Sequence, residues 1–315
     1  GQVGDVQRLL AENPANIERR GRSNSTPLTI AASRGHETVV ALLIAHGALV
    51  SVTQEIGMSP LHAAAASGHL AVTRLLLNAG ADPTATDCVG LHPLHYAAQN
   101  GHAEVVELLL ASGAFVSCKA NDETSPIHLA SMQGHVAVVL LLLEANAEPS
   151  ATDQHLISPL HLAAKEGHLD VLTLLLQRGA DVSARTTSGV TALHHAASGG
   201  HERVLALLLD HGSDVSSVSI SGHTALQAAA CGGHEAAVRL LFQRGADVLA
   251  VRHGHTARDS ATLNGHLRVA AVLQEEAVRR AYCEAFAMGQ LERLGARSRV
   301  RWLDVGVVKI VLEHM

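Results

Sequence analysis

Apolar residues recur along the chain in two short blocks separated by polar punctuation, and residues 158–184 show the arrangement in full. In the first block, 158–166, leucine and alanine recur at the spacing of one helical face, and Gly167 follows. In the second block, 168–178, leucines and a valine form another helical face, which stops at Gly179. Glycine readily adopts the left-handed conformation that ends many helices. The pattern therefore predicts two short helices followed by a loop.

The same pair of blocks recurs at a nearly constant spacing. The residue before the Pro-Leu or Ala-Leu pair advances in steps of 33 from Thr26 to Thr224, and a step of 32 leads to Thr256. A Gly-His pair keeps this spacing from Gly35-His36 to Gly265-His266. Most residues at the first position are Ser or Thr, whose hydroxyl can cap a helix, and Pro often follows, where no hydrogen bond is lost. Each unit is therefore predicted to begin with a capped helix.

A period of 33 residues with a TPLH-x-A-like opening resembles the ankyrin repeat. The resemblance covers about residues 1–274. It implies an all-α solenoid of helix-turn-helix units with projecting hairpin loops. Residues 1–20 align with the second half of a repeat, and eight full repeats follow over about 21–274. Residues 275–315 form a divergent C-terminal segment, with a faint echo of a ninth repeat and a tail.

The two ends of the array depart from the pattern. The chain begins at Gly1, inside a repeat, so we expect a fragment or a trimmed product. Its first helix is either a natural N-terminal cap or the remnant of upstream repeats. In the unit at 251–274, Arg258 and Asp259 stand where inner repeats have Leu and His. Polar residues on a face that is otherwise buried suit a terminal cap.

Composition excludes several classes of function. A net charge of −6, a pI near 6.4 and 2% aromatic residues argue against nucleic-acid binding, which favours a basic stripe with stacking aromatics. No apolar run reaches the roughly 18 residues of a membrane span, so direct membrane insertion is not expected. The four cysteines form no CxxC pair or disulfide framework. We therefore expect a reducing compartment, the cytoplasm or the nucleus.

Twenty-two histidines raise the question of a metal or catalytic site. Thirteen occupy the Gly-His and Pro-Leu-His positions of the repeat, which the resemblance implies are structural. Among the others, His253 and His255 lack the cysteine or spaced carboxylate that a zinc site needs. No nucleophile elbow, metalloprotease, P-loop or dinucleotide-binding motif is present. We predict no enzyme activity, no catalytic residue, no cofactor and no metal.

The resemblance implies that partners bind at the hairpin tips and the exposed end of each first helix. Exposed apolar residues mark interaction sites when they are contiguous. The alternative is that tip residues vary neutrally or pack on adjacent hairpins. The predicted partner-binding residues are Ile56, Met58, Val89, Leu91, Asn121, Asp122, Met132, Leu156, Ile157, Lys165, Val190 and Ile220.

The sequence thus predicts a monomeric scaffold or adaptor that binds one or more partner proteins without catalysis. Two alternatives stay open. The array could be the substrate-recognition arm of a ubiquitin ligase, which would need a recruiting box near 298–315, where the usual Leu-Cys-Arg pattern is missing. It could also be the ankyrin domain of a longer multidomain protein.

Overall fold

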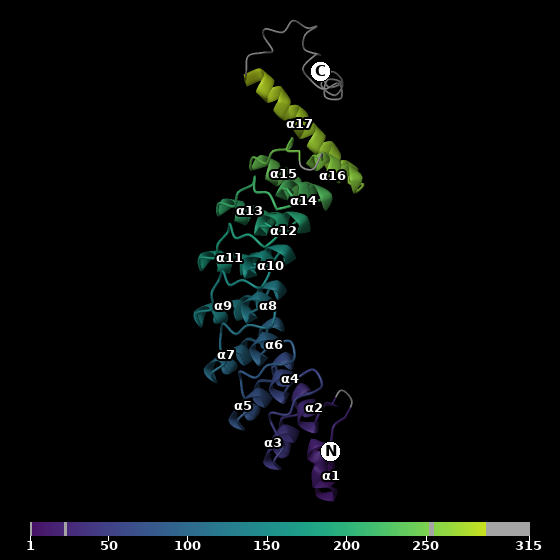
Figure 1. The fold of residues 1–315 in the computed structure, drawn as a ribbon, viewed down its shortest axis with the longest axis vertical. Helices are drawn as coiled ribbons and strands as arrows, with labels where there is room; N and C mark the ends of the chain where they lie inside the picture. The colour runs from purple at the N-terminus through teal and green to yellow at the C-terminus, as the bar shows by residue number, and fades with distance from the viewer. Residues whose placement is uncertain (1, 22–23, 252–254, 288–315) are drawn as a thin grey trace. The chain divides into compact units, whose positions relative to one another are not determined.

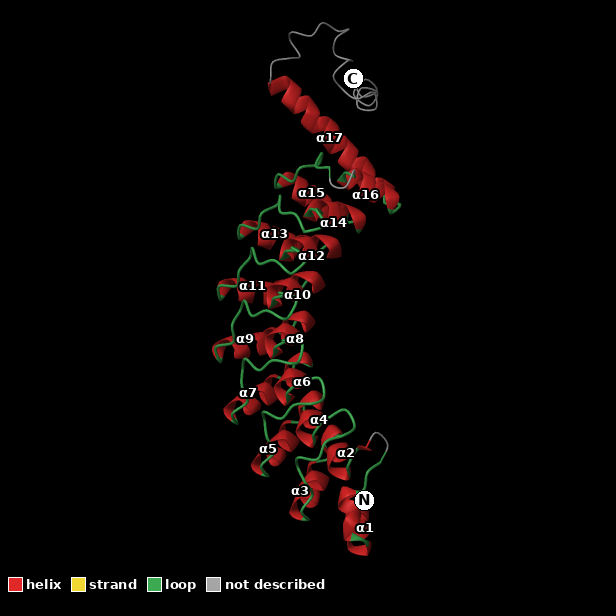
Figure 2. Cartoon of the chain, in the orientation of Figure 1, coloured by secondary structure: helices red, strands yellow, loops and turns green. Residues whose placement is uncertain are grey.

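The computed structural model describes residues 2–21, 24–251 and 255–287. Within these ranges the chain consists of helices and loops, with one isolated β-bridge between Val218 and Thr224 (Figures 1 and 2). The prediction of an all-α repeat fold is confirmed. The chain divides into two units, Gly1–Thr187 and Ser188–Met315, which are described separately.

In the first unit the helices pack in two rows, and each helix contacts the next one in its row (Figure 1). The inner row is α2 Pro27–Ser33, α4 Pro60–Ser67, α6 Pro93–Gln99, α8 Pro126–Gln133 and α10 Pro159–Glu166. The outer row is α3 Glu37–Ala45, α5 Leu70–Asn78, α7 Ala103–Ala111, α9 Val136–Glu144 and α11 Leu169–Gln177. Helix α1, Gln2–Glu12, packs beside α3, and the 3-10 helix η1, Pro14–Glu18, contacts α1 and α2.

The second unit repeats this arrangement. Its inner row is α12 Ala192–Gly199, α14 Ala225–Cys231 and α16 Ala257–Leu263. Its outer row is α13 Glu202–Asp210, α15 Glu235–Gln243 and α17 Leu267–Ala287. Helix α17 runs without a break through residue 274, where we placed the end of the array. Most of the sequence that echoes a ninth repeat, and all of 298–315, lies outside the described residues.

The core lies between the two rows. In the second interior repeat, Leu61 and Ala64 of α4 and Val72 and Leu76 of α5 are fully buried. Alanine on the inner helix lets the outer helix approach closely, while leucine and valine fill the remaining space. One helix pair has too little apolar surface to be stable alone, so each repeat depends on burial against its neighbours.

In five consecutive repeats, a buried histidine at the third position of the inner helix connects the repeat to a following loop. In α4, the Nδ1 atom of His62 accepts a hydrogen bond from the Ser59 backbone N–H at 3.2 Å. Because Nδ1 accepts this bond, we assign the ring proton to Nε2. The Nε2 atom donates to the carbonyl of Leu91, 29 residues further on, at 3.0 Å. Equivalent bonds join His95 to Thr124 and His128 to Ile157. One side chain therefore caps its own helix and holds the base of the next hairpin.

The histidines of five Gly-His pairs, His69, His102, His135, His168 and His234, contact a carbonyl oxygen of the preceding repeat instead. The Nε2 atom of His69 lies 3.2 Å from the carbonyl oxygen of Ser33, and that of His168 lies 3.0 Å from the carbonyl oxygen of Met132. A Cβ atom on Gly134 would lie 2.6 Å from Nδ1 of His168. The glycine thus provides the left-handed turn and the space for the histidine ring. Both repeated histidine positions have structural roles, as the resemblance implied.

The last inner helix keeps the cap with a different residue. Thr256 caps α16, and its backbone N–H and hydroxyl both donate to a carboxylate oxygen of Asp259 at 2.8 Å. These hydrogen bonds hold the pKa of Asp259 below its usual value. Arg258 is exposed. Of the two polar residues that mark this unit in the sequence, Asp259 therefore completes the cap at the helix start and Arg258 lies at the surface.

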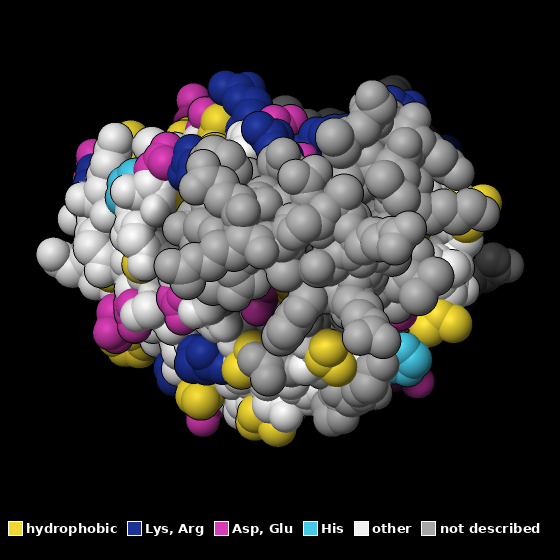
Figure 3. All heavy atoms as spheres, turned by 90° about the horizontal axis from the view of Figure 1, so that it is seen from above, with side chains coloured by type: hydrophobic (Ala, Val, Ile, Leu, Met, Phe, Trp, Pro, Cys, Tyr) yellow, Lys and Arg dark blue, Asp and Glu magenta, His cyan; other side chains and the backbone are white. Residues whose placement is uncertain are grey.

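Among the described residues visible in Figure 3, basic and acidic side chains lie near one another. In the second unit, Arg244 lies 2.6 Å from Asp210, and Arg268 lies 2.6 Å from a Glu235 oxygen. Such exposed ion pairs each contribute less than about 1 kcal/mol. Their effect is to divide the surface charge into small patches of both signs.

In the described hairpins between residues 21 and 223, one tip residue has a positive φ angle. Glycine occupies this position in four repeats, including Gly57 and Gly90, whereas Asn24, Glu123 and Leu156 occupy it with φ angles of 60°, 64° and 56°. A non-glycine residue in this conformation costs roughly 1–2 kcal/mol because its Cβ approaches the following carbonyl oxygen. Leu156 therefore holds backbone strain that a glycine would relieve.

We expect folding stability to fall as the pH drops from about 6.5 toward 4. Burial lowers the pKa of His62, His95 and His128, to about 4 for His95. In this window the unfolded chain binds protons that the folded chain does not, so stability present above the unfolded pKa is lost on acidification. His95 alone accounts for about 2 kcal/mol between neutral pH and pH 5. Urea unfolding followed by circular dichroism at both pH values measures the loss.

The variant His95→Gln is the matched control. Gln227 already occupies the equivalent position in the second unit, where its Oε1 accepts from Thr224 and its Nε2 donates to the carbonyl of His255, each at 3.1 Å. Glutamine makes both bonds without titrating, so His95→Gln should fold and show a weaker pH dependence. If the variant loses as much stability in acid as the parent chain, other groups cause the acid sensitivity.

Replacing Leu156 with glycine should stabilise the protein by up to about 1 kcal/mol, because glycine adopts a positive φ angle without strain. Equilibrium unfolding in urea measures the change. The control is Gly90→Leu at the equivalent tip, where a Cβ atom would lie 2.8 Å from the backbone nitrogen of Asn121 and must destabilise. A destabilised Leu156→Gly variant would mean that the leucine contributes packing that outweighs its strain.

Candidate functional site

Neighbouring hairpin tips in the first unit are joined by backbone hydrogen bonds. Cys88 donates to the carbonyl of Ile56 at 3.2 Å, and Asn121 donates to Val89 at 3.0 Å. Two further bonds continue the series, from Gln154 to Asp122 and from Thr187 to His155. The tips therefore form a preformed row, so a partner that binds them needs to order little backbone.

A buried carboxylate fixes the second of these hairpins from inside. One oxygen of Asp87 accepts hydrogen bonds from the backbone of Val89 and Leu91, both at 2.9 Å. The other oxygen accepts the Tyr96 hydroxyl at 2.6 Å. Burial and this carboxylate raise the pKa of Tyr96 well above its ordinary value. Asp153 accepts two equivalent backbone bonds in the hairpin of Leu156. Both hairpins are thus rigid supports for apolar side chains.

The predicted apolar residues of the first unit divide into two kinds. Ile56, Val89 and Leu156 are 53%, 51% and 48% exposed at the tips. The other three residues, Met58, Leu91 and Ile157, are partly buried at the base of the hairpins. The backbone carbonyls of Leu91 and Ile157 accept the hydrogen bonds from His62 and His128 described above. The tip residues are therefore accessible to a partner, and the base residues support them.

The third hairpin of this row is polar. Asn121 and Asp122 are exposed, and a carboxylate oxygen of Asp122 accepts the backbone N–H of Thr124 at 3.0 Å. Glu123, at the positive-φ position, lies 2.9 Å from the Lys119 ammonium. Along the chain, an acidic tip thus separates the apolar tips of Ile56 and Val89 from that of Leu156.

The inner helices contribute a second line of residues beside the hairpins. Met132 is partly exposed near the end of α8, and Lys165 is exposed near the end of α10, 3.8 Å from Glu166. Our sequence analysis missed the fourth position after the cap residue on these helices, which is partly exposed in Tyr96, Leu129 and Leu162. Aligning the repeats on the cap would have revealed this position, because its residue varies while the flanking residues on these helices stay histidine and alanine.

The two remaining predicted residues belong to the second unit. Ile220 is 78% exposed at a hairpin tip, and its backbone N–H donates to the carbonyl of Ser188 at 2.9 Å. Val190 is partly buried at the base of the preceding hairpin. All the other predicted residues belong to the first unit. That the whole set forms a single contact stripe stays a prediction.

The second unit has a cavity of about 560 Å³ between its hairpins and its inner row. Polar side chains from three consecutive repeats line it, among them His195, His223, Cys231 and Asn264. Val190 and Leu263 supply apolar contacts. The side-chain nitrogen of Asn264 lies 3.4 Å from the sulfur of Cys231. This cavity therefore differs in chemistry from the apolar tips of the first unit.

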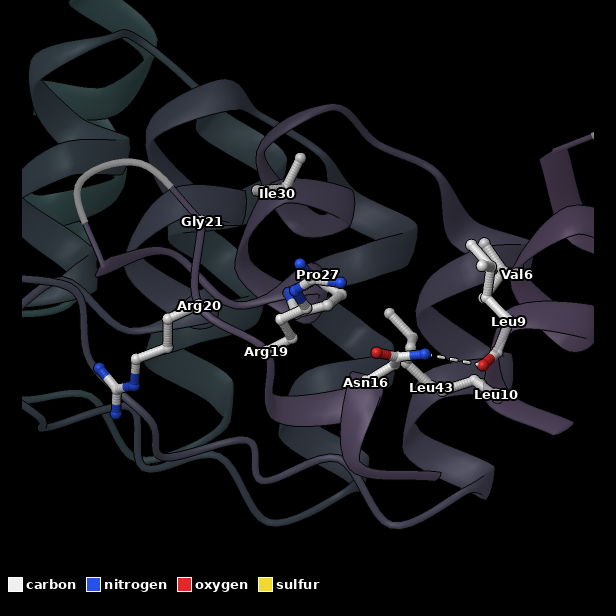
Figure 4. Close-up of a pocket in the computed structure, with 10 residues that line it drawn as sticks. All are labelled: Val6, Leu9, Leu10, Asn16, Arg19, Arg20, Gly21, Pro27, Ile30 and Leu43. Atoms are coloured by element: carbon white, nitrogen blue, oxygen red, sulfur yellow. Dashed lines mark hydrogen bonds between the residues drawn. The ribbon is translucent and has the colours of Figure 1, made fainter. Parts of the chain in front are cut away.

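A smaller pocket of about 300 Å³ lies between α1, the loop after η1, and α2 (Figure 4). Leu9 and Ile30 line it, and both are exposed to a similar degree. The side-chain amide of Asn16 donates to the carbonyl of Leu9 at 2.9 Å, which ties η1 to α1. The pocket occurs where α1 packs on the outer row and η1 meets α2. It is mainly apolar and lacks a convergent set of polar groups.

Titratable residues elsewhere have structural partners. The carboxylates of Asp82 and Asp181 accept the backbone and hydroxyl of a Thr or Ser two residues later, which lowers their pKa. Burial raises the pKa of the Cys118 thiol to about 12, so it is not a nucleophile at neutral pH. Among the described residues, no three His, Cys, Asp or Glu side chains are placed to hold a metal ion. His253 lies outside the described residues.

None of the helices in the described part of the chain combines the length and apolarity needed to cross a bilayer.

Comparisons with known proteins agree with this architecture. A family model described as three copies of ankyrin repeats matches residues 1–87, 85–153 and 152–219, and a single-repeat model matches 221–252. Among solved structures, the crystal structure of the human ASB11 ankyrin repeat domain is similar, with a TM-score of 0.66 and 30% sequence identity. That match covers 71% of this chain and 99% of the other. A comparison with curated proteins finds no match. The repeated motifs, the paired rows of helices and these matches show that the chain belongs to the ankyrin-repeat family.

Proposed function

We propose that this protein is a scaffold or adaptor that binds a partner protein through the hairpin tips and inner helices of its first unit. Ankyrin repeats are in general protein-interaction modules and not catalysts. The observation that carries the proposal is the set of three half-exposed apolar tips, Ile56, Val89 and Leu156, on hairpins joined by backbone hydrogen bonds. Such an arrangement presents apolar side chains that need little further ordering on binding.

Leu156 gives the proposal its most specific support. Its side chain is accessible, yet its backbone adopts a conformation that glycine adopts without strain in four of the related tips. Strained residues concentrate at sites where function requires them. A leucine here adds apolar contact area for a partner at the expense of fold stability. The contact surface is supported at the hairpin bases by Met58, Leu91 and Ile157, and on the inner row by Met132.

The acidic tip between the apolar ones contributes specificity. Asn121 and Asp122 are exposed in the third hairpin, and Lys165 lies on the inner helix of the following repeat. A partner that fits this face has apolar residues for the tips and a basic or hydrogen-bonding group opposite Asp122. Polar complementarity of this kind selects partners more than it adds affinity. The protein acts in this role as a monomer.

The role as a substrate-recognition arm of a ubiquitin ligase is a special case of the same binding activity. It requires a recruiting segment near 298–315, outside the described residues. Val190 and Ile220 are proposed as contact residues of the second unit by itself.

The variant Ile56→Ser, Val89→Ser, Leu156→Ser should lose its partner, with at least about a tenfold lower yield of the crosslinked protein. Crosslinking mass spectrometry of the purified chain in cell lysate measures this yield, and the crosslinked positions report the face in contact. Serine removes the apolar side chains while the hairpin backbone bonds stay in place, and exposed substitutions change stability little.

The matched control is Leu49→Ser, Phe115→Ser, Val136→Ser. It removes the same number of exposed apolar side chains from the first unit, away from the tips. The control should retain the partner that the tip variant loses, and circular dichroism should show the same helicity for both. If the tip variant captures the same proteins as the parent chain, the first-unit tips are not the binding surface.

A further inference from the structure

The pocket at the start of the first unit exposes apolar surface of α2 that the later inner helices bury. Pro27 is partly exposed, whereas the equivalent proline is buried in α4, α6, α8 and α10. Ile30 is 39% exposed, while the residue at the same position of those four helices is buried or partly buried. Each later inner helix of the unit packs against the one before it, but α2 packs on this side against η1, which has five residues.

Helix α1 supplies the facing wall of the pocket. Val6 and Leu9 line it, and Leu9 is 47% exposed, while Leu10 and Leu43 are buried. The pocket volume is about 300 Å³. An apolar cavity of roughly 150 Å³ accommodates a benzene ring, so this pocket has room for a large aliphatic side chain.

Two arginines stand at the rim of the pocket, and their side chains run in different directions. Figure 4 shows the Arg19 side chain extending toward Pro27, whereas the Arg20 side chain points away from the apolar side chains. The Arg20 guanidinium donates to the carbonyl of Thr53 at 3.2 Å. Arg19 is exposed, and a guanidinium offers a plane of N–H donors that fits a carboxylate. Arg19 is therefore the cation that a ligand in the pocket would meet.

The carboxylates of the same elements do not cancel this positive charge inside the pocket. The described residues that line it include no Asp or Glu. On α1, Asp5 and Glu12 lie 4.0 Å and 3.7 Å from Arg8. Glu18 of η1 accepts the backbone N–H of Leu49 at 2.8 Å. Charge complementarity therefore favours an anionic group beside an apolar one in this pocket.

We propose that this pocket binds a segment of a partner protein in which an aliphatic side chain stands next to a carboxylate. The aliphatic side chain packs between Leu9 and Ile30, and the carboxylate accepts hydrogen bonds from the Arg19 guanidinium. The site goes beyond the tip surface proposed above, because none of the residues that line it belongs to that surface.

Fluorescence anisotropy of the full chain at pH 7 with a labelled peptide of sequence ELLEELLE tests the proposal. The peptides QLLQQLLQ and ESSEESSE each lack one of the two features. Each should bind about tenfold more weakly, because the first loses the charge-assisted hydrogen bonds and the second loses the apolar burial. If either control peptide binds as tightly as ELLEELLE, the proposal is wrong.

The variant Arg19→Gln should bind ELLEELLE about tenfold more weakly and QLLQQLLQ as the parent chain does, because only the carboxylate contact is lost. Arg19 is exposed, so the substitution should change stability little. The matched control Arg34→Gln removes an exposed arginine at the other end of α2 and should leave both affinities unchanged. Parent-like binding of ELLEELLE by Arg19→Gln overturns the proposal.

The double variant Leu9→Ser, Ile30→Ser should bind both ELLEELLE and QLLQQLLQ more weakly. The control Phe115→Ser, which removes another exposed apolar side chain of the first unit, should bind both like the parent chain. Circular dichroism and urea unfolding verify that the variants are folded. Light scattering tests the other occupant: a dimer of the parent chain that the double variant converts to a monomer would mean that the pocket takes a second copy, against the proposal.

The pocket and the tip surface can fail separately. If Arg19→Gln keeps its affinity for ELLEELLE while the tip variant still loses its partner, the pocket proposal is wrong and the tip surface stands. If the tip variant keeps the captured partner and Arg19→Gln loses it, the pocket is the binding surface and the tips are not.

Discussion

The hydrogen bonds of the buried inner-helix histidine hold the repeats in register. Each such ring accepts from the backbone at the start of its own helix and donates to a carbonyl at the base of the following hairpin. It thereby satisfies polar groups at two places that are far apart in the sequence, without water. Apolar burial between the rows supplies most of the stability, but it is not directional. The histidine bonds set where each hairpin begins.

Because the base of each hairpin is fixed in this way, its tip can vary. Backbone bonds between neighbouring tips keep the row in place whatever side chains it has, and buried carboxylates such as Asp87 add support from inside. Leu156 shows how far this tolerance extends, since the tip keeps the left-handed conformation with a residue that disfavours it. Separation of a rigid framework from variable contact residues is what allows one fold to serve many partners.

The two units use this freedom differently. In the first unit, the apolar tips of Ile56, Val89 and Leu156 flank the acidic tip of Asn121 and Asp122. In the second unit, a cavity is lined by a mixture of apolar residues with histidine, serine and asparagine.

The sequence alone determined the fold class and, through the resemblance, implied the structural role of most histidines, because one period of 33 residues repeats the same local signals. It also identified the loops that present Ile56, Val89 and Leu156. Only the tertiary structure showed that these side chains are half exposed while Met58, Leu91 and Ile157 support them, since burial depends on the neighbouring repeat. The strain at Leu156 needed backbone angles, and the continuous helix α17 needed its packing partners. The cavity beside His195 and His223 joins residues of three repeats, so no local pattern could reveal it.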